Sequence, residues 1–258
     1  MPAWTRDDTE AVVCCVCQRE GRPVYDLDPF GVVRCPRCSL LFVSPRLRPE
    51  ALQRLYDEPQ YHQGVYGGAA ELFLQRRWTA GRLALATREL GRPPSGARLL
   101  EVGAGHGLFL EAARERGFDV VGVELSQTAA AYARSSLGLT VHSTQLADAP
   151  LDGRFDVVCA WDTLEHVPDP VEFWRTVRAV LADDGVVLFS TPYVSSLPAR
   201  VLRQRWWTLK PAEHIWQFTP QTHRLVAAQA GMRVTRTLRN PLTRANFARL
   251  DSLVGVAR

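Results

Sequence analysis

The strongest constraint on this fold is a regular alternation of strand-like and helix-like segments that begins near residue 98. Segments of the two types follow each other in the order 98–102, 108–116, 120–123, 127–136, 139–142, 155–160, 171–181 and 186–190. Strands that alternate with helices in this way form a parallel sheet with helices on both faces. Ligands of such sheets bind at the carboxyl ends of the strands. We therefore predict an α/β fold with its functional site at that edge.

The remaining segments lead into this sheet and complete it. Helical patterns cover 49–56 and 71–90 before the first strand, and a helical pattern at 220–230 follows the alternating series. A strand pattern at 232–237 and a last apolar run at 253–257 follow.

A glycine-rich turn joins the first predicted strand to the helix after it. The residues from Glu101 to Gly107 read Glu-Val-Gly-Ala-Gly-His-Gly. Glycines at this point permit tight backbone geometry and close approach of a ligand. A dinucleotide fold places its third glycine three residues after the second, but that position is Leu108 and the third glycine comes one residue earlier. The spacing disfavours a nicotinamide dinucleotide.

Two acidic residues frame this turn. Glu101 ends the first strand, where its charge would repel a phosphate and attract the ammonium of a methionine moiety. Glu124 ends the next strand, 17 residues after Gly107, where a carboxylate accepts hydrogen bonds from both hydroxyls of a ribose. The pair suits an adenosyl amino acid. The alternative is a tight turn whose acids are merely solvated.

The segment from Glu101 to Glu124 resembles the cofactor motifs of class I S-adenosylmethionine-dependent methyltransferases, and the resemblance covers most of residues 40–238. It implies a Rossmann-like, seven-stranded sheet and S-adenosylmethionine as cofactor. Residues 155–170 resemble the fourth-strand signature of a subgroup that includes quinone-methylating enzymes. The family's usual Asp after the third strand is replaced by Gln145. The residues that the resemblance assigns to the cofactor are Glu101, Gly103, Ala104, Gly105, Gly107, Glu124, Leu125, Gln145, Leu146, Trp161 and Asp162.

Two Cys-x-x-Cys pairs lie near the N-terminus, with 17 residues between them. Their members are Cys14, Cys17, Cys35 and Cys38. This spacing fits four thiolates around one Zn²⁺, and a site closed by four sulfur ligands is structural rather than catalytic. The alternative is two reduced, partly buried pairs. A register that uses Cys15 also stays open.

The second pair adds a finer resemblance. Residues 35–45 resemble the second knuckle of ribbon-fronted methyltransferases that are often associated with sugar, polysaccharide or secondary-metabolite modification. We accordingly divide the chain into a zinc ribbon at 1–48, a helical lead-in at 49–96 and an S-adenosylmethionine-binding methyltransferase domain at 97–258.

Methyl transfer to a hydroxyl or a carbon acid needs a base, and histidine is the natural candidate. His166 follows the fourth strand, and His214 lies in a loop that leads into a helix. His166 and the pair Glu213-His214 resemble active-site residues of zinc-ribbon sugar C-methyltransferases, in which the pair serves in proton abstraction. We expect Glu213, His214 and His166 to be the catalytic residues. For each histidine the alternative is a structural role in its own loop.

A basic and aromatic cluster precedes His214. It comprises Arg200, Arg203, Arg205, Trp206, Trp207 and Lys210. Such a cluster holds a diphosphate, stacks a ring or contacts RNA, or it is an amphipathic helix with packed Trp and solvated Arg side chains. We expect it to form part of a lid over the acceptor.

Composition indicates the class of protein but not its function. The net charge of +4 and the 46% hydrophobic content are those of an ordinary globular protein. The sequence shows neither a secretory signal nor an apolar run of about 20 residues, so we expect a cytoplasmic protein without a membrane partner.

The expected function is methylation of a small-molecule acceptor, on an oxygen of a sugar, polyketide-like or other secondary-metabolite substrate. C-methylation is disfavoured, because the sugar C-methyltransferases carry a further C-terminal domain without a counterpart here. Two alternatives remain. The first is an RNA base methyltransferase whose ribbon binds RNA, because residues 14–48 hold six Arg against three acids. The second is a non-catalytic zinc-ribbon interaction protein with a vestigial cofactor fold.

Overall fold

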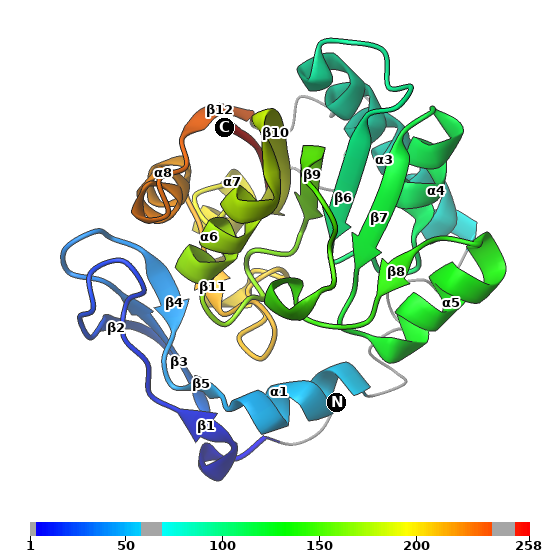
Figure 1. Ribbon diagram of the computed structural model, residues 1–258. Coiled ribbons are helices and arrows are strands. Elements are labelled where there is room, and N and C mark those ends of the chain that lie inside the picture. The colour runs from blue at the N-terminus through cyan, green and yellow to red at the C-terminus, as the bar shows by residue number, and fades with distance from the viewer. Residues whose placement is uncertain (1–3, 58–68, 239–250) are drawn as a thin grey trace.

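The structure is a computed structural model and describes residues 4–57, 69–238 and 251–258 (Figure 1). The N-terminal part contains a short 3-10 helix (Arg6–Asp8), β1 (Thr9–Glu10), β2 (Arg22–Leu27), β3 (Phe30–Arg34), β4 (Leu41–Val43), β5 (Arg46–Leu47) and α1 (Pro49–Asp57). The following part contains α3 (Ala69–Leu90), β6 (Arg98–Val102), α4 (Leu108–Glu115), β7 (Asp119–Val123), α5 (Gln127–Leu137), β8 (Val141–His142), β9 (Phe155–Trp161) and α6 (Pro170–Val180). The last part contains β10 (Leu181–Pro192), α7 (Leu197–Leu202), β11 (Trp216–Gln217), α8 (Pro220–Gln229), β12 (Val234–Leu238) and β13 (Ser252–Ala257).

The central sheet confirms the predicted α/β fold. Its seven strands lie in the order β12-β13-β10-β9-β6-β7-β8. The five strands from β10 to β8 in this order are parallel, whereas β13 runs antiparallel to both β10 and β12. The carboxyl ends of the parallel strands therefore share one edge of the sheet, which is where α/β proteins bind their ligands.

Helices cover both faces of this sheet, as β9 illustrates. Val157, Cys159 and Trp161 belong to the core cluster that includes α3, α4 and α5. Val158 and Ala160 belong to the cluster that includes α6 and α8. Successive side chains of a strand point to opposite faces, and both faces of β9 are buried, which accounts for its apolar run from Val157 to Trp161.

Local caps fix where several helices begin. The Asp169 side chain accepts hydrogen bonds from the backbone N–H groups of Val171 and Glu172, and Pro170 occupies the first turn of α6. Thr219 and Pro220 repeat this arrangement at the start of α8. The segment that we predicted to be a strand from 139 is shorter, because Gly138 is left-handed and the Leu139 N–H closes α5 on the Ala133 carbonyl.

The N-terminal segment forms a second sheet that includes a strand from the far end of the sequence. Its order is β11-β4-β3-β2, and the antiparallel pairing joins Trp216 to Phe42 and Gln217 to Leu41. Figure 1 shows this sheet beside α6 and α8. Phe42 and Trp216 also belong to the same core cluster as Trp174 of α6 and Phe218. The cysteine-bearing segment is thus packed continuously onto the larger part of the chain.

Across residues 4–57, 69–238 and 251–258, none of the helices combines the length and the apolarity that crossing a bilayer requires.

Candidate active site

The glycine turn lies at the carboxyl end of β6, in the middle of the sheet. Gly103, Gly105 and Gly107 have φ angles of 75°, 54° and 82°, which are left-handed values that favour glycine. A Cβ atom on Gly103 would lie 2.5 Å from the Thr163 hydroxyl oxygen. Gly103 is therefore required both by its backbone conformation and by the close approach of the loop after β9.

Glu124, at the end of β7, ties this turn to the next strand. One of its carboxylate oxygens accepts a hydrogen bond from the Gly105 N–H at 2.7 Å, and the other accepts one from the Ser126 N–H at 2.8 Å. Each carboxylate oxygen has a second acceptor position. Glu124 can therefore hold the turn in shape and accept further hydrogen bonds from a ligand.

Three buried polar atoms without a hydrogen-bond partner among the described residues lie at this edge of the sheet. They are Oε2 of Glu101, Oγ of Ser143 and Nε1 of Trp161, which end or follow β6, β8 and β9. Buried polar atoms are almost always paired in proteins, so three unpaired atoms at one edge indicate a polar ligand. S-adenosylmethionine carries an ammonium, ribose hydroxyls and an adenine, and this donor and acceptor set fits it.

The electrostatics at Glu101 agree with a cationic group of a ligand. Burial raises the pKa of Glu101 well above its ordinary value, Arg82 opposes this rise and Glu124 adds to it. A buried carboxyl of this kind is stabilised in its charged form when an ammonium binds beside it.

Arg82 of α3 closes over the same region. Its guanidinium pairs with the Asp162 carboxylate at 2.7 Å and lies 5.0 Å from the ring centroid of Trp161. The second oxygen of Asp162 accepts a hydrogen bond from the Ser190 hydroxyl at 3.0 Å. The family resemblance assigns Trp161 and Asp162 to the cofactor but not Arg82, because a lone Arg within a helical pattern carries no signal of its own.

The remaining predicted cofactor residues differ in exposure. Ala104 and Leu146 are buried, Leu125 is half-buried, and Gln145 is exposed. Ser143, two residues before Gln145, is the residue with an unpaired buried hydroxyl oxygen. The family resemblance assigns Gln145, at the usual Asp position, and gives no signal for Ser143.

The four predicted zinc ligands come together in the ribbon. The sulfur atoms of Cys14, Cys17, Cys35 and Cys38 all lie within 4.8 Å of one another, and Cys15 is outside this group. The sulfurs of Cys14 and Cys38 are 3.5 Å apart, close to the roughly 3.8 Å between two sulfurs on a tetrahedral zinc ion. The donor set and its spacing therefore fit Zn²⁺.

The two knuckles have the same backbone design. In the first, the Gln18 N–H bonds to the Cys14 carbonyl, and the Cys14 N–H bonds to the Arg19 carbonyl. The second repeats both bonds 21 residues later, with Ser39 in place of Gln18, and Gln18 and Ser39 are both left-handed at φ 52° and 63°. Hydrogen bonds from the Cys15 thiol and from the Cys17 and Val16 N–H groups lower the pKa of Cys14 to about 4.

The three predicted catalytic residues lie in two loops that meet at the carboxyl end of β9. The rings of His166 and His214 are in edge-to-face contact, with 4.7 Å between their centroids. The carboxylate of Glu165 joins them, and ligand atoms of Glu165, His166 and His214 all lie within 4.8 Å of one another. This spacing suits proton transfer and would also suit a divalent cation.

The tautomer of His214 follows from its partner. Its Nδ1 lies 2.7 Å from the Thr208 carbonyl oxygen, and because a carbonyl only accepts, Nδ1 carries the proton. Nε2 of the neutral ring is then a proton acceptor. Burial, followed by the proximity of His166, lowers the pKa of His214 well below its ordinary value. Burial also lowers the pKa of His166 to about 4.

Glu213 has a different neighbour from the one its sequence pairing with His214 suggests. Its buried carboxylate lies 3.4 Å from the Lys210 ammonium, whereas the His214 Nδ1 is bound by Thr208. The Glu213 backbone forms a hydrogen bond with His166. The catalytic role of Glu213 stays a prediction.

Trp216 of β11 connects the two histidine loops with the ribbon. Its backbone N–H bonds to the Glu165 carbonyl at 3.2 Å, and its indole N–H bonds to the Val167 carbonyl at 2.8 Å. The neighbouring Ile215 carbonyl accepts a hydrogen bond from the Val43 N–H at the end of β4. Trp216 therefore holds His166 from both sides while it pairs with the ribbon sheet. The sequence around Trp216 carries no signal of this role.

The basic and aromatic cluster divides between core and surface. Trp206 is buried, whereas Trp207 and the three Arg side chains are exposed. The buried Trp206 indole donates a hydrogen bond to Asp251 at 2.9 Å. The role of the cluster as a lid stays a prediction.

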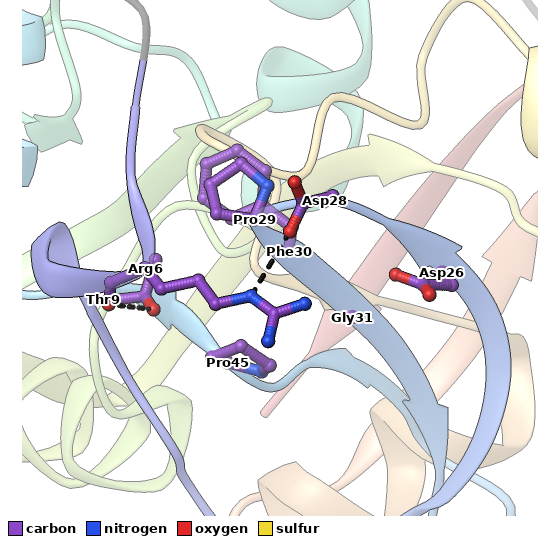
Figure 2. Close-up of a pocket in the computed structure, with 8 residues that line it drawn as sticks. All are labelled: Arg6, Thr9, Asp26, Asp28, Pro29, Phe30, Gly31 and Pro45. Atoms are coloured by element: carbon purple, nitrogen blue, oxygen red, sulfur yellow. Dashed lines mark hydrogen bonds and ion pairs between the residues drawn. The ribbon is translucent and has the colours of Figure 1, made fainter.

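A cavity of about 290 Å³ lies within the ribbon, away from these groups (Figure 2). Arg6 and Asp28 form an exposed ion pair at its rim, and Pro29 and Pro45 line it. Its lining includes none of the predicted ligand or catalytic residues, so we assign no function to it.

Comparison with known proteins agrees with this geometry. A family model described as a methyltransferase domain matches residues 71–237, more than half of the chain. The chain is 39% identical over 105 residues to the ubiquinone biosynthesis O-methyltransferase of Methylococcus capsulatus, a match that covers 38% of this chain and 44% of that protein. It is 34% identical over 156 residues to the protein of the same name from a Caulobacter species, covering 55% and 61%. The chain thus spans about half the length of these relatives.

Solved structures show the same fold. The 1,6-didemethyltoxoflavin-N1-methyltransferase of Burkholderia thailandensis, with bound S-adenosylhomocysteine, superposes with a TM-score of 0.60 at 21% identity over 92% of this chain and 98% of that one. The magnesium protoporphyrin IX methyltransferase of Synechocystis, also with bound S-adenosylhomocysteine, gives a TM-score of 0.62 at 17% identity over 81% and 99%.

Proposed function

The chain belongs to the S-adenosylmethionine-dependent methyltransferase family whose domain model covers residues 71–237, and we propose that it methylates a hydroxyl oxygen of a small-molecule acceptor, with His214 as the base. The observation that carries the proposal is the histidine pair at the carboxyl end of β9. One buried, neutral imidazole there has its Nδ1 proton committed to a carbonyl, and its Nε2 is a proton acceptor.

The cofactor end of the site belongs to the glycine turn. When bound, S-adenosylmethionine supplies an electrophilic methyl group. Glu101 would hold the ammonium of the cofactor, Glu124 its ribose hydroxyls, and Ser143 and Trp161 present further polar atoms at the same edge. Methyl transfer depends strongly on alignment, and strands that end side by side position these groups without a mobile segment.

The acceptor end of the site belongs to the two histidine loops. Nε2 of His214 takes the proton of the acceptor hydroxyl as the oxygen becomes nucleophilic. The ring then carries a positive charge, and the buried Glu165 carboxylate, within 4.8 Å, stabilises that charge. The alignment of the acceptor oxygen with this ring decides which hydroxyl reacts.

The acceptor class is supported by the relatives. The curated relatives are named ubiquinone biosynthesis O-methyltransferases, which favours an acceptor with a phenolic or similar hydroxyl. Sugar, polyketide-like and other secondary-metabolite hydroxyls suit the same chemistry. A hydroxyl acceptor needs a base near neutral pH, and the pair His166 and His214 supplies one.

We further propose a structural Zn²⁺ at Cys14, Cys17, Cys35 and Cys38. Four sulfur ligands leave no position for a substrate, so the ion would act by holding the knuckles. The second knuckle leads directly into β4, which pairs with β11 just after His214. The ion therefore supports the acceptor loop from a distance.

The test is a separation of turnover from cofactor affinity. His214→Ala should lower turnover at least about tenfold, because general bases contribute roughly 10²–10⁴-fold to such rates. Its affinity for S-adenosylhomocysteine, measured by calorimetry, should stay near that of the unchanged protein. Turnover is followed as S-adenosylhomocysteine release with catechols and hexoses as acceptors.

His214→Asn is the matched control, because its side-chain amide still has N–H groups to donate to the Thr208 carbonyl but cannot act as a base. Equal losses of turnover in both variants support His214 as the base. Recovery of turnover in His214→Asn, or loss of cofactor binding in either variant, would mean that His214 only anchors its loop.

A further inference from the structure

A buried carboxylate that is distant from His214 in the sequence is linked to it through Thr208. Asp251, at the residue before β13, has only 3% of its surface exposed. One of its oxygens, Oδ2, accepts a hydrogen bond from the Thr208 hydroxyl at 2.7 Å and a second from the Trp206 indole N–H at 2.9 Å. Both donors belong to the segment that leads to His214.

The same threonine contacts the histidine with its backbone. The Thr208 carbonyl oxygen lies 2.7 Å from Nδ1 of His214. Asp251, Thr208 and His214 thus form a chain of two short hydrogen bonds: the Thr208 hydroxyl donates to Asp251, and the Thr208 carbonyl accepts from Nδ1 of His214. A carbonyl can hold one tautomer of a histidine only if its own position is fixed.

We infer that Asp251 is a positioning residue for the reaction: by anchoring Thr208 through its hydroxyl, it fixes the Thr208 carbonyl and so holds His214 as the tautomer with its proton on Nδ1. The Asp251 carboxylate is bound by Thr208 and Trp206 rather than by the glycine turn or by the histidine rings. Its effect reaches the reaction only through the orientation and tautomer of His214. The inference rests on the proposed function for its effect on turnover, but the tautomer itself is measurable without turnover.

Variants of the two donors to Asp251 distinguish a specific link through Thr208 from a general loss of packing. Thr208→Val removes the hydroxyl while it keeps the side-chain shape and the backbone carbonyl. Trp206→Phe removes the other hydrogen bond to the same oxygen, but Trp206 does not contact His214 with its carbonyl. Thr208→Ser restores the hydroxyl. Asp251→Ala removes the anchor completely.

The experiment is ¹⁵N NMR of the histidine side chains in the full-length, zinc-loaded protein, with His214 assigned from the resonances lost in His214→Asn. In the unchanged protein, we expect Nδ1 protonated and Nε2 unprotonated. In Thr208→Val and Asp251→Ala, we expect both tautomers or an Nε2 proton. Trp206→Phe and Thr208→Ser should keep the native signature. Turnover should fall at least about tenfold in Thr208→Val, with affinity for S-adenosylhomocysteine unchanged.

Two outcomes overturn the inference. The first is a native His214 NMR signature in Thr208→Val. This variant decides the test even if Asp251→Ala fails to fold. The second is an equal disturbance in Trp206→Phe, which would indicate loosened packing rather than a specific link through Thr208. If the tautomer changes as expected but turnover does not, the link from Asp251 to the His214 tautomer stands, but His214 is not the base and Asp251 is not a positioning residue for the reaction.

Discussion

The proposed cofactor side and the proposed acceptor side of the site are assembled in different ways. On the cofactor side, the turn from Gly103 to Gly107 and the anchor Glu124 come from one continuous stretch of strand, helix and strand. On the acceptor side, His166 and His214 come from separate loops and are held by the ribbon strand β4 and by Asp251. A local motif specifies the first side, whereas long-range contacts specify the second.

This difference gives the ribbon a definite place in the molecule. Its sheet accepts β11 as a fourth strand, and Trp216 of that strand carries hydrogen bonds to the backbone around His166. No described hydrogen bond links the four cysteines to the glycine turn. Disturbance of the ribbon should therefore affect the acceptor side first.

Loss of the proposed Zn²⁺ from the ribbon should have the greatest effect on turnover. Replacing Cys35 and Cys38 together by Ser should lower turnover about a hundredfold or more, since a released acceptor loop removes the contribution of the base. S-adenosylhomocysteine affinity of the folded variant, measured by calorimetry, should stay within about threefold, because the glycine turn keeps its contacts.

The matched control is Cys15→Ser, which alters a cysteine outside the four-sulfur group and should leave turnover near native. Equal loss of turnover and cofactor affinity in the double variant would contradict the comparison, because it would make the ribbon part of the cofactor side.

The next effect falls on the cofactor side alone. Glu124→Ala should weaken S-adenosylhomocysteine binding by about tenfold to a hundredfold, because the Gly105 and Ser126 N–H groups lose a charged acceptor along with the ligand contact. Asp148→Ala, at an exposed acid in the short 3-10 helix after β8, is the control and should bind normally. An intact His214 NMR signature in Glu124→Ala would show that the two sides are independent.

A smaller effect, on stability, is expected where the glycine turn contacts the loop after β9. Gly103→Ala should lower the free energy of unfolding by about 1–2 kcal/mol for its left-handed backbone alone, plus the contact with Thr163. Adding Thr163→Ala should recover the contact part of the loss, since the new Cβ then has space. Denaturant unfolding of the two single variants and the double variant measures this coupling. Strictly additive losses would mean that Gly103 and the loop after β9 do not constrain each other.

The smallest effect is a pH dependence of stability. His223 is fully buried, receives or donates one hydrogen bond with Thr191, and burial lowers its pKa to about 3. His223 therefore binds a proton below pH 6.5 in the unfolded chain, but only below about pH 3 in the folded chain. Its contribution to stability is complete above pH 6.5 and is lost as the pH falls below that value.

The slope of this loss approaches about 1.4 kcal/mol per pH unit for one histidine. His166 and His214 add slopes of the same sign, because burial lowers the pKa of each. In His223→Gln, the free energy of unfolding should fall less steeply between pH 6 and pH 5, by about 1 kcal/mol. Parallel pH profiles of the two proteins would contradict a neutral, buried His223.

The sequence could predict the parts of the molecule that depend on local chemistry. The first strand and the glycine turn were predictable because apolar periodicity, glycine spacing and flanking acids all act over a few residues. The two cysteine pairs were predictable for the same reason, since each knuckle closes on its own backbone. The start of α8 follows from Thr219 and Pro220, whose capping role is also local.

The parts that it could not predict are those where distant segments meet. The two-residue segment Trp216–Gln217 is too short for its sequence to predict a strand. It becomes a strand only because it pairs with Phe42 of the ribbon. Asp251 carries no motif, because its importance comes from Trp206 and Thr208 folding onto it. Arg82 likewise gains its role only where α3 crosses the end of β9.

Calorimetric titration of the zinc-loaded protein with S-adenosylhomocysteine tests whether the glycine turn binds the adenosyl cofactor independently of the acceptor side. We expect one binding site per chain, with an affinity that His214→Ala leaves unchanged and Glu124→Ala weakens. Absence of binding to the unchanged protein, or equal weakening in both variants, would contradict it.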